Sequence, residues 1–184
     1  TCHITSCGSV ILQSSLPEAM ISIDKAEKYV SEISNTDIFS AIGIGPGLGT
    51  EPETRKALMN LLSASKKPLV LDADALNILS LHKEWLSLLP PGSVLTPHIK
   101  EFERLAGKAL NGFARLKKQV EFSKDHNCIV VLKGAHTSVT TPDGNIFFNS
   151  SGNPGMATGG SGDVLTGIIL SLLAQGYTSS DASI

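Results

Sequence analysis

The stretch "GGSGDVLTGIILSLLAQG" (residues 159–176) passes from glycine-rich to strongly apolar sequence within a few residues. The apolar residues of its second half predict a helix that ends at Gly176. Gly159, Gly160 and Gly162 leave backbone N–H groups unshielded at the start of that helix, where the helix dipole carries about half a positive charge. The ligand that such a helix start favours is an anion, for example a phosphoryl group.

Asp163 follows the glycine cluster and falls in the first turn of the predicted helix. One interpretation is structural, since an acid in the first turn stabilises a helix by about 1 kcal/mol. The other is catalytic, because a carboxylate beside a phosphoryl site can accept the proton of an attacking hydroxyl. Residues 152–167 include six glycines, more than a cap requires, and we therefore favour a catalytic base.

The rest of the chain alternates strand-length apolar runs with helical patterns, which predicts an α/β fold with a mostly parallel sheet. We expect strands at residues 9–13, 38–45, 68–74, 93–97 and 128–134, a hairpin at 137–149, and helices at 23–33, 51–65, 98–107, 112–127 and 161–176. No repeat or linker interrupts this pattern. Residues 1–184 are therefore predicted to form a single domain.

The composition narrows the class of protein. The 184 residues are 41% hydrophobic and carry a net charge of −2, which argues against a nucleic-acid surface. No apolar run reaches the roughly 18 residues of a membrane span, and three cysteines without metal-ligand spacing predict free thiols in a reducing cytoplasm. Because Thr1 begins within strand-like sequence and Ile184 ends where a capped helix begins, we expect a fragment of a longer chain, truncated at both ends.

Ligands of open α/β sheets bind beyond the carboxyl ends of the strands, so the residues at those ends are candidates for a site. The segment "GIGPGLGT" (43–50) follows one predicted strand, and we favour a ligand-binding loop over a purely structural turn. Asp72 and Asp74 of "LDADALN" (71–77) follow the next. They could orient Mg²⁺-bound water or a substrate hydroxyl, but Asp74 is equally well placed to cap a helix.

Two further strand ends carry polar residues. His98 and Glu101 of "TPHIKE" (96–101) are three residues apart and are expected on one helix face, His98 to bond a substrate and Glu101 to hold a metal-bound water. Lys133 opens "KGAHT" (133–137) after an apolar strand. A cation and free amides there suit a phosphate, although a lysine that only ends a strand in solvent is the alternative.

Several of these motifs together resemble a known family. "GGSGDVLTG" (159–167) resembles the G-[AS]-G-D anion-hole signature of ribokinase-like folds. Together with "AIGIGPGLG" (41–49), it is similar to the paired signatures of the YjeF C-terminal domain, the ADP- or ATP-dependent NAD(P)H-hydrate dehydratase. "PEAM" (17–20), "LDADALN", "TPHIKEFERLAG" and "KGAHT" also resemble that family, in the same order. The resemblance covers nearly the whole chain and implies a ribokinase-like three-layer fold.

The resemblance also implies a reaction. ADP or ATP, with Mg²⁺, would phosphorylate the hydroxyl of NAD(P)H hydrate, and loss of phosphate would restore NAD(P)H, with Asp163 as the base. The implied nucleotide-binding residues are Lys133, Gly134, Ala135, His136, Thr137, Gly159, Gly160, Ser161 and Gly162. The implied substrate-binding residues are Gly47, Gly49, His98 and Asp163, and Glu101 would hold Mg²⁺ through water.

Alternatives to this activity stay open from the sequence. Vitamin and sugar kinases of the same fold tend to carry Asn-x-x-Glu where this chain has His98-x-x-Glu101, which favours the dehydratase. A kinase of a small alcohol and a nucleotide-binding module without activity remain alternatives. The resemblance further implies self-association, with a tetramer among the assemblies it allows. An NAD(P)H-hydrate epimerase domain is often fused ahead of this one in the family.

Overall fold

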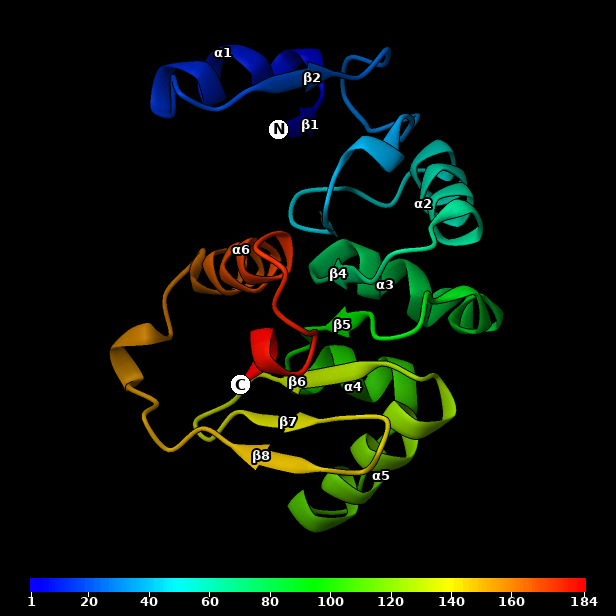
Figure 1. Cartoon of the computed structure of the whole chain (residues 1–184), viewed down its shortest axis with the longest axis vertical. Coiled ribbons are helices and arrows are strands. Elements are labelled where there is room, and N and C mark those ends of the chain that lie inside the picture. Colours follow the sequence, from blue (N-terminus) through cyan, green and yellow to red (C-terminus); the bar gives the residue numbers. More distant parts are fainter.

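The centre of the fold is a six-stranded sheet (Figure 1). The structure is a computed structural model that describes all residues from 1 to 184. Neighbouring strands follow the order of the chain: β3 (Ile42–Ile44), β4 (Leu69–Leu71), β5 (Val94–Leu95), β6 (Ile129–Leu132), β7 (Ser138–Thr140) and β8 (Ile146–Phe148). Strands β3 to β6 are parallel, and β7 and β8 form an antiparallel hairpin beside them. The sheet is therefore mostly parallel, as the sequence predicts.

Helices cover both faces of this sheet. The connections between the parallel strands supply α2 (Pro52–Ala64), α3 (Ala73–Leu81), the 3₁₀ helix η2 (Lys83–Leu88), α4 (Ile99–Ala106) and α5 (Gly112–Asp125). Their side chains share an apolar cluster with Leu69 and Leu71 of β4. Val70, between those two, belongs instead to a second cluster with Ile169 of α6 (Ser161–Ala174). Successive side chains of a strand point to opposite faces, so the sheet lies between two helical layers.

The amino-terminal part lies apart from the large sheet, at the top of Figure 1. Strand β1 (Cys2–Ile4) pairs in parallel with β2 (Ile21–Ile23), and α1 (Ser6–Ser15) connects them. The strand predicted at residues 9–13 is therefore wrong. A short apolar run has no period that separates strand from helix, and two parallel strands need a crossover between them.

The helix predicted at residues 23–33 is also wrong, because a buried carboxylate holds this segment in another shape. Asp24 accepts hydrogen bonds from the backbone N–H groups of Ala26, Ser31 and Glu32, at 2.7 to 3.1 Å. Such bonds offer the backbone an alternative to helical pairing. The hydroxyl of Thr54 donates to the carbonyl of Val30 and so joins this segment to α2.

The remaining predicted elements are present with shorter ends. The four later helices and the hairpin are confirmed, and Pro52 is the first residue of α2. The strand predicted at residues 38–45 is reduced to β3 and follows the 3₁₀ turn η1 (Thr36–Ile38). Two further 3₁₀ turns, η3 (Pro154–Met156) and η4 (Asp181–Ser183), flank α6. No helix of the structure combines the length and the apolar character that crossing a membrane demands.

Candidate functional site

The carboxyl ends of β4 and β6 meet the start of α6. Asp72 follows β4, and Lys133 follows β6. Lys133 Nζ donates to Asp72 Oδ1 at 2.7 Å, and the hydroxyl of Thr166 in α6 donates to Asp72 Oδ2 at 2.8 Å. Three segments that are far apart in the sequence therefore form one hydrogen-bonded cluster, at the edge of the sheet where the sequence predicts a site.

Asp72 is the centre of this cluster and is almost fully enclosed, with 2% of its side chain exposed. Its Oδ1 also accepts from the N–H of Ala73, which makes Asp72, and not Asp74, the cap of α3. Ala73 has a φ of 45°, in the left-handed region. A residue with a side chain is strained there by roughly 1–2 kcal/mol, and such strain persists only where the surroundings impose it.

Lys133, predicted either to bind a phosphate or to end its strand in solvent, does not extend freely into solvent. Its side chain is 22% exposed and ion-paired with Asp72. A lysine ammonium has three N–H donors, so two remain beyond the one that Asp72 accepts. A Cβ atom at Gly162 would lie 3.3 Å from Nζ. The ammonium group is thus held directly beside the start of α6.

The start of α6 fits an anionic group. Gly160 caps the helix with a φ of 87°, and the N–H groups of Gly162 and Asp163 donate to no acceptor. A Cβ atom at Gly159 or Gly160 would meet nothing within 4 Å, so there is open space beside the residues that precede these amides. Unpaired N–H groups at the positive end of a helix, with an ammonium group beside them, are suited to phosphoryl oxygens.

Asp163 lies exposed in the first turn of α6. Its carboxylate accepts no hydrogen bond, and the cap of this helix is Gly160, not Asp163. The structural interpretation of Asp163 is therefore reduced to its interaction with the helix dipole. An unengaged carboxylate next to an anion site is free to accept a proton.

His98 and Glu101 form a reciprocal cap at the start of α4. Glu101 Oε2 accepts from the N–H of His98 at 2.8 Å, and His98 Nδ1 accepts from the N–H groups of Lys100 and Glu101. The spacing predicts that His98 and Glu101 share a helical face. His98 instead precedes the helix as its cap, so the two residues do not share a face. The backbone of His98 also pairs with that of Lys133, so the half-exposed imidazole belongs to the same edge.

The residues present do not form a protein-bound metal site. The structure has no group of three or more His, Cys, Asp or Glu side chains that could hold a metal ion. The carboxylate of Glu101 is buried and engaged by His98, and that of Asp72 is engaged by Lys133 and Thr166. Mg²⁺ at this edge would have to depend on the phosphates of a nucleotide, as is common for this ion.

The glycine loop after β3 packs against Asp72 and Asp74. A Cβ atom at Gly45 would lie 1.8 Å from the carbonyl oxygen of Asp72. The N–H of Gly49 donates to Asp74 Oδ2 at 2.9 Å, so this amide is already used inside the protein. Around Gly47, with a φ of 64°, a Cβ atom would meet nothing within 4 Å. Of the two predicted substrate-binding glycines, Gly47 faces open space, and Gly49 anchors the loop.

The predicted nucleotide-binding residues 133–137 form the turn between β6 and β7. Gly134, Ala135 and His136 are exposed, and the hydroxyl of Thr137 donates to the carbonyl of Gly134. A Cβ atom at Gly152 would lie 2.5 Å from the carbonyl oxygen of Ala135, so the segment that leads to α6 passes close to this turn. The turn is also linked to the start of α6 through Lys133, whose ammonium group lies beside Gly162.

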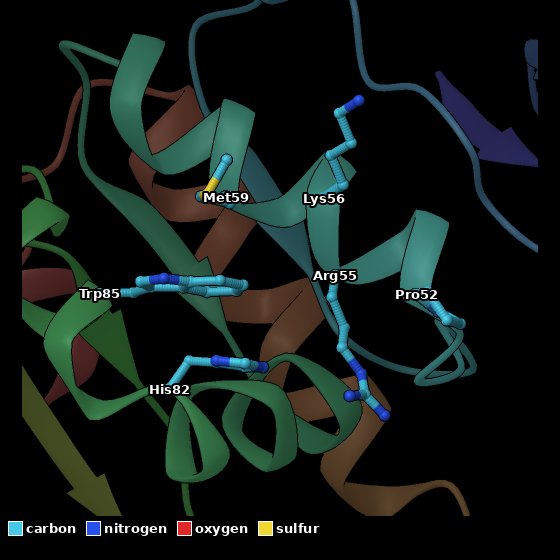
Figure 2. A pocket seen from close by; sticks show the side chains of 6 residues that line it. All are labelled: Pro52, Arg55, Lys56, Met59, His82 and Trp85. Atoms are coloured by element: carbon cyan, nitrogen blue, oxygen red, sulfur yellow. The ribbon is translucent and has the colours of Figure 1, made fainter.

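A separate hollow of about 280 Å³ lies between α2 and η2. Figure 2 shows the rings of Trp85 and His82 face to face in this hollow, with centroids 4.2 Å apart. Its other lining residues are Pro52, Arg55, Lys56 and Met59. None of the residues at the start of α6 lines it, so the hollow is not part of the candidate site.

Comparisons with known proteins point to one family. The family model described as NAD(P)H-hydrate dehydratase matches residues 2–184. The bifunctional NAD(P)H-hydrate repair enzyme Nnr of Thermofilum pendens is 41% identical over 152 residues, which are 82% of this chain and 28% of that protein. The ADP-dependent (S)-NAD(P)H-hydrate dehydratase of Neisseria meningitidis is 40% identical over 92% of this chain and 61% of its own length.

A comparison with a solved structure points to the same family. The ADP/ATP-dependent NAD(P)H-hydrate dehydratase of Bacillus subtilis, co-crystallised with ATP and Mg²⁺ and soaked with CoA, superimposes with a TM-score of 0.69 at 28% identity. The match covers 97% of this chain and 64% of that protein. The chain therefore spans less than two thirds of each of these three relatives.

Proposed function

Because the chain belongs to the NAD(P)H-hydrate dehydratase family, we propose that the protein containing it converts NAD(P)H hydrate to NAD(P)H and consumes ADP or ATP. The observation that carries this proposal is the start of α6, where unpaired N–H groups, the ammonium of Lys133 and the unengaged carboxylate of Asp163 adjoin one open space. This combination serves phosphoryl transfer to a hydroxyl group.

Asp163 accepts the proton of the hydrate's hydroxyl as the oxygen forms its bond to the terminal phosphoryl group of the nucleotide. The bond from that phosphorus to the nucleotide breaks at the same time, and the N–H groups of Gly162 and Asp163 stabilise the charge on the phosphoryl oxygens. The carbon–oxygen bond of the phosphorylated hydrate then breaks, and phosphate leaves with the electron pair. Loss of a proton from the neighbouring ring carbon restores the double bond.

The other predicted residues bind the two substrates. The exposed turn of residues 133–137 holds the nucleotide, and Gly160 and Ser161 bring its phosphates to the helix start. Gly47 and the half-exposed imidazole of His98 contact the hydrate, whereas Gly49 acts through its bond to Asp74. The proximity of His98 to Lys133, which the backbone pairing fixes, supports this division of the site.

The decisive experiment supplies NADH hydrate and Mg²⁺ to the full-length protein with ADP, with ATP or with no nucleotide. We expect the absorbance of reduced nicotinamide to return only when a nucleotide is present. A folded protein that binds ADP and restores no NADH would refute the proposal. A panel of small alcohols is the matched control, because a kinase of the same fold stops after phosphorylation and accumulates a stable phosphate ester.

The proposal extends to the parent protein. The relative in Thermofilum pendens is named a bifunctional repair enzyme, and this chain matches 28% of it. That share supports a second domain, an NAD(P)H-hydrate epimerase, in the parent of this chain. Self-association of the parent and a cytoplasmic location are part of the same proposal, and size-exclusion chromatography with light scattering would test the first.

A further inference from the structure

The two carboxylates of "LDADALN" hold different parts of the candidate site. We propose that Asp72 and Asp74 are positioning residues with separate tasks, an inference that rests on the proposed function. Asp72 orients the phosphoryl side through Lys133 and α6, and Asp74 orients the substrate side through Gly49. Neither aspartate contacts a substrate in this proposal, and each acts through the group that it holds.

The carboxylate of Asp72 is already engaged by three donors and is almost fully enclosed. Its two oxygens accept from Ala73, Lys133 and Thr166, all at 2.7 to 2.8 Å, and its side chain is 2% exposed. With its side chain almost fully enclosed, the carboxylate can be reached by a metal or substrate only if the residues around it move. The bonds instead fix a flexible lysine chain and one face of α6. Gly162 and Thr166 are four residues apart, so the same helical face carries both the anchor and the glycine beside Nζ.

Asp74 performs the corresponding task for the glycine loop. Its Oδ2 accepts the N–H of Gly49, and its Oδ1 accepts from the side-chain amide of Asn77 at 3.2 Å. Asn77 in turn accepts from Arg104 of α4 at 2.6 Å. A relay of three side chains thus connects α4 to the loop. Gly47 stands in open space two residues before the anchored amide, so its position depends on that bond.

Separate tasks predict a split in the kinetics of substitutions. In Asp72→Asn the carbonyl oxygen still accepts from Thr166, but the charge that holds Lys133 is lost. We expect kcat to fall by about tenfold to a hundredfold, with little change in KM for the hydrate. In Asp74→Ala the acceptor for Gly49 is lost, and we expect KM for the hydrate to rise by about tenfold with kcat nearly unchanged. Asp74→Asn keeps an acceptor and should restore KM.

A double-variant cycle tests whether Asp72 acts through Lys133. In the Lys133→Met background, Asp72→Asn should cause no further loss of kcat, whereas independent roles would multiply the two losses. Asp72→Asn alone leaves a largely buried lysine without its partner and could unfold the protein. The double variant removes both charges, so comparing it with Lys133→Met keeps the test valid. The melting temperature of each variant is the measure of folding.

Binding measurements separate this inference from the proposed function. Calorimetry with ADP and with NADPH, the reaction product, needs no turnover. Asp72→Asn should weaken ADP and spare NADPH, and Asp74→Ala should do the reverse. If the two variants show this split in binding but the wild-type protein has no activity, only the proposed reaction is overturned. A wild-type protein that is active, with both variants impaired equally towards both ligands, would overturn the separate positioning roles.

Discussion

Asp163 is the residue on which the proposed chemistry depends most directly. Its carboxylate is exposed and makes no hydrogen bond to the first turn of α6, in which it lies. We therefore expect Asp163→Asn to lower turnover by about a hundredfold or more, because loss of a general base has that effect. ADP affinity and the melting temperature should change little. Asp125→Asn, at an exposed position on α5, is the control, and an Asp163→Asn protein of normal activity would leave Asp163 only a helix-dipole role.

The three cysteines differ in reactivity for a physical reason. Burial raises the pKa of the Cys128 thiol to about 12, whereas Cys2 and Cys7 are exposed. The thiolate is the nucleophile, so a buried thiol of high pKa is inert. We expect a thiol reagent at neutral pH to label Cys2 and Cys7 in the native protein and Cys128 only after unfolding. Mass spectrometry of the labelled peptides reads this directly, and rapid labelling of native Cys128 would contradict the structure.

Individual residues of the site could be predicted where the sequence indicates that they directly follow a strand. Lys133 and His98 are of this kind, and both lie at the expected edge of the sheet. The partner of Lys133 could not be predicted, since Asp72 is 61 residues away in the sequence and the choice between Asp72 and Asp74 depends on the turn at Ala73. Neither aspartate carries a spacing signal that separates a cap from an anchor.

At the scale of elements, the loop after β3 is packed tightly at one glycine and loosely at another. A methyl group at Gly45 would overlap the Asp72 carbonyl, while one at Gly47 would meet no neighbour. Gly47→Ala should cost roughly 1–2 kcal/mol, from its left-handed backbone alone. Gly45→Ala adds overpacking against the backbone, and we expect it to cost more than about 3 kcal/mol. Urea unfolding of both variants measures the difference, and equal losses would contradict the packing.

Elements were predictable where the period of apolar residues was clear. Helix α2 buries Leu58, Leu61 and Leu62 on one face, as the sequence indicates. Helix α1 buries no residue, so its sequence carries no such stripe, and its short apolar run predicts a strand as readily as a helix. The segment of residues 23–33 has helical spacing, but the bonds to Asp24 decide its shape. A tertiary contact of this kind overrides local propensity.

The whole molecule brings its site together from the sheet and one of the two helical layers. Asp72 and Lys133 follow strands of the sheet. Thr166 comes from α6, which covers one face of the sheet, whereas α2, α3, α4 and α5 cover the other. The alternating apolar runs correctly predicted an α/β fold with a mostly parallel sheet, and the family resemblance implied the three layers. The pairing of β1 with β2 away from the large sheet was not predictable, because pairing partners of short strands depend on register and not on composition.

The charge of Asp24, in the amino-terminal part of the molecule, makes the stability of the protein depend on pH in acid. Burial raises the pKa of this carboxyl, but the hydrogen bonds from Ser31, Ala26 and Glu32 outweigh burial and hold the pKa well below its usual range. The native protein therefore keeps Asp24 charged at a pH where the unfolded chain, with a pKa of about 3.9, becomes protonated. The stabilisation is complete above about pH 4 and is lost progressively as the pH falls below that value.

The test is the free energy of unfolding of the wild type and of Asp24→Asn between neutral and acidic pH. The amide cannot accept all the bonds that the carboxylate accepts, so the variant should be less stable by about 2 kcal/mol at neutral pH. Because it has no charge to lose, its stability should fall less steeply below about pH 4 than that of the wild type. Asp37→Asn, at an exposed position in η1, is the matched control and should follow the wild-type curve. If Asp24→Asn and the wild type lose stability in parallel as the pH falls, Asp24 does not hold this part of the molecule as a carboxylate.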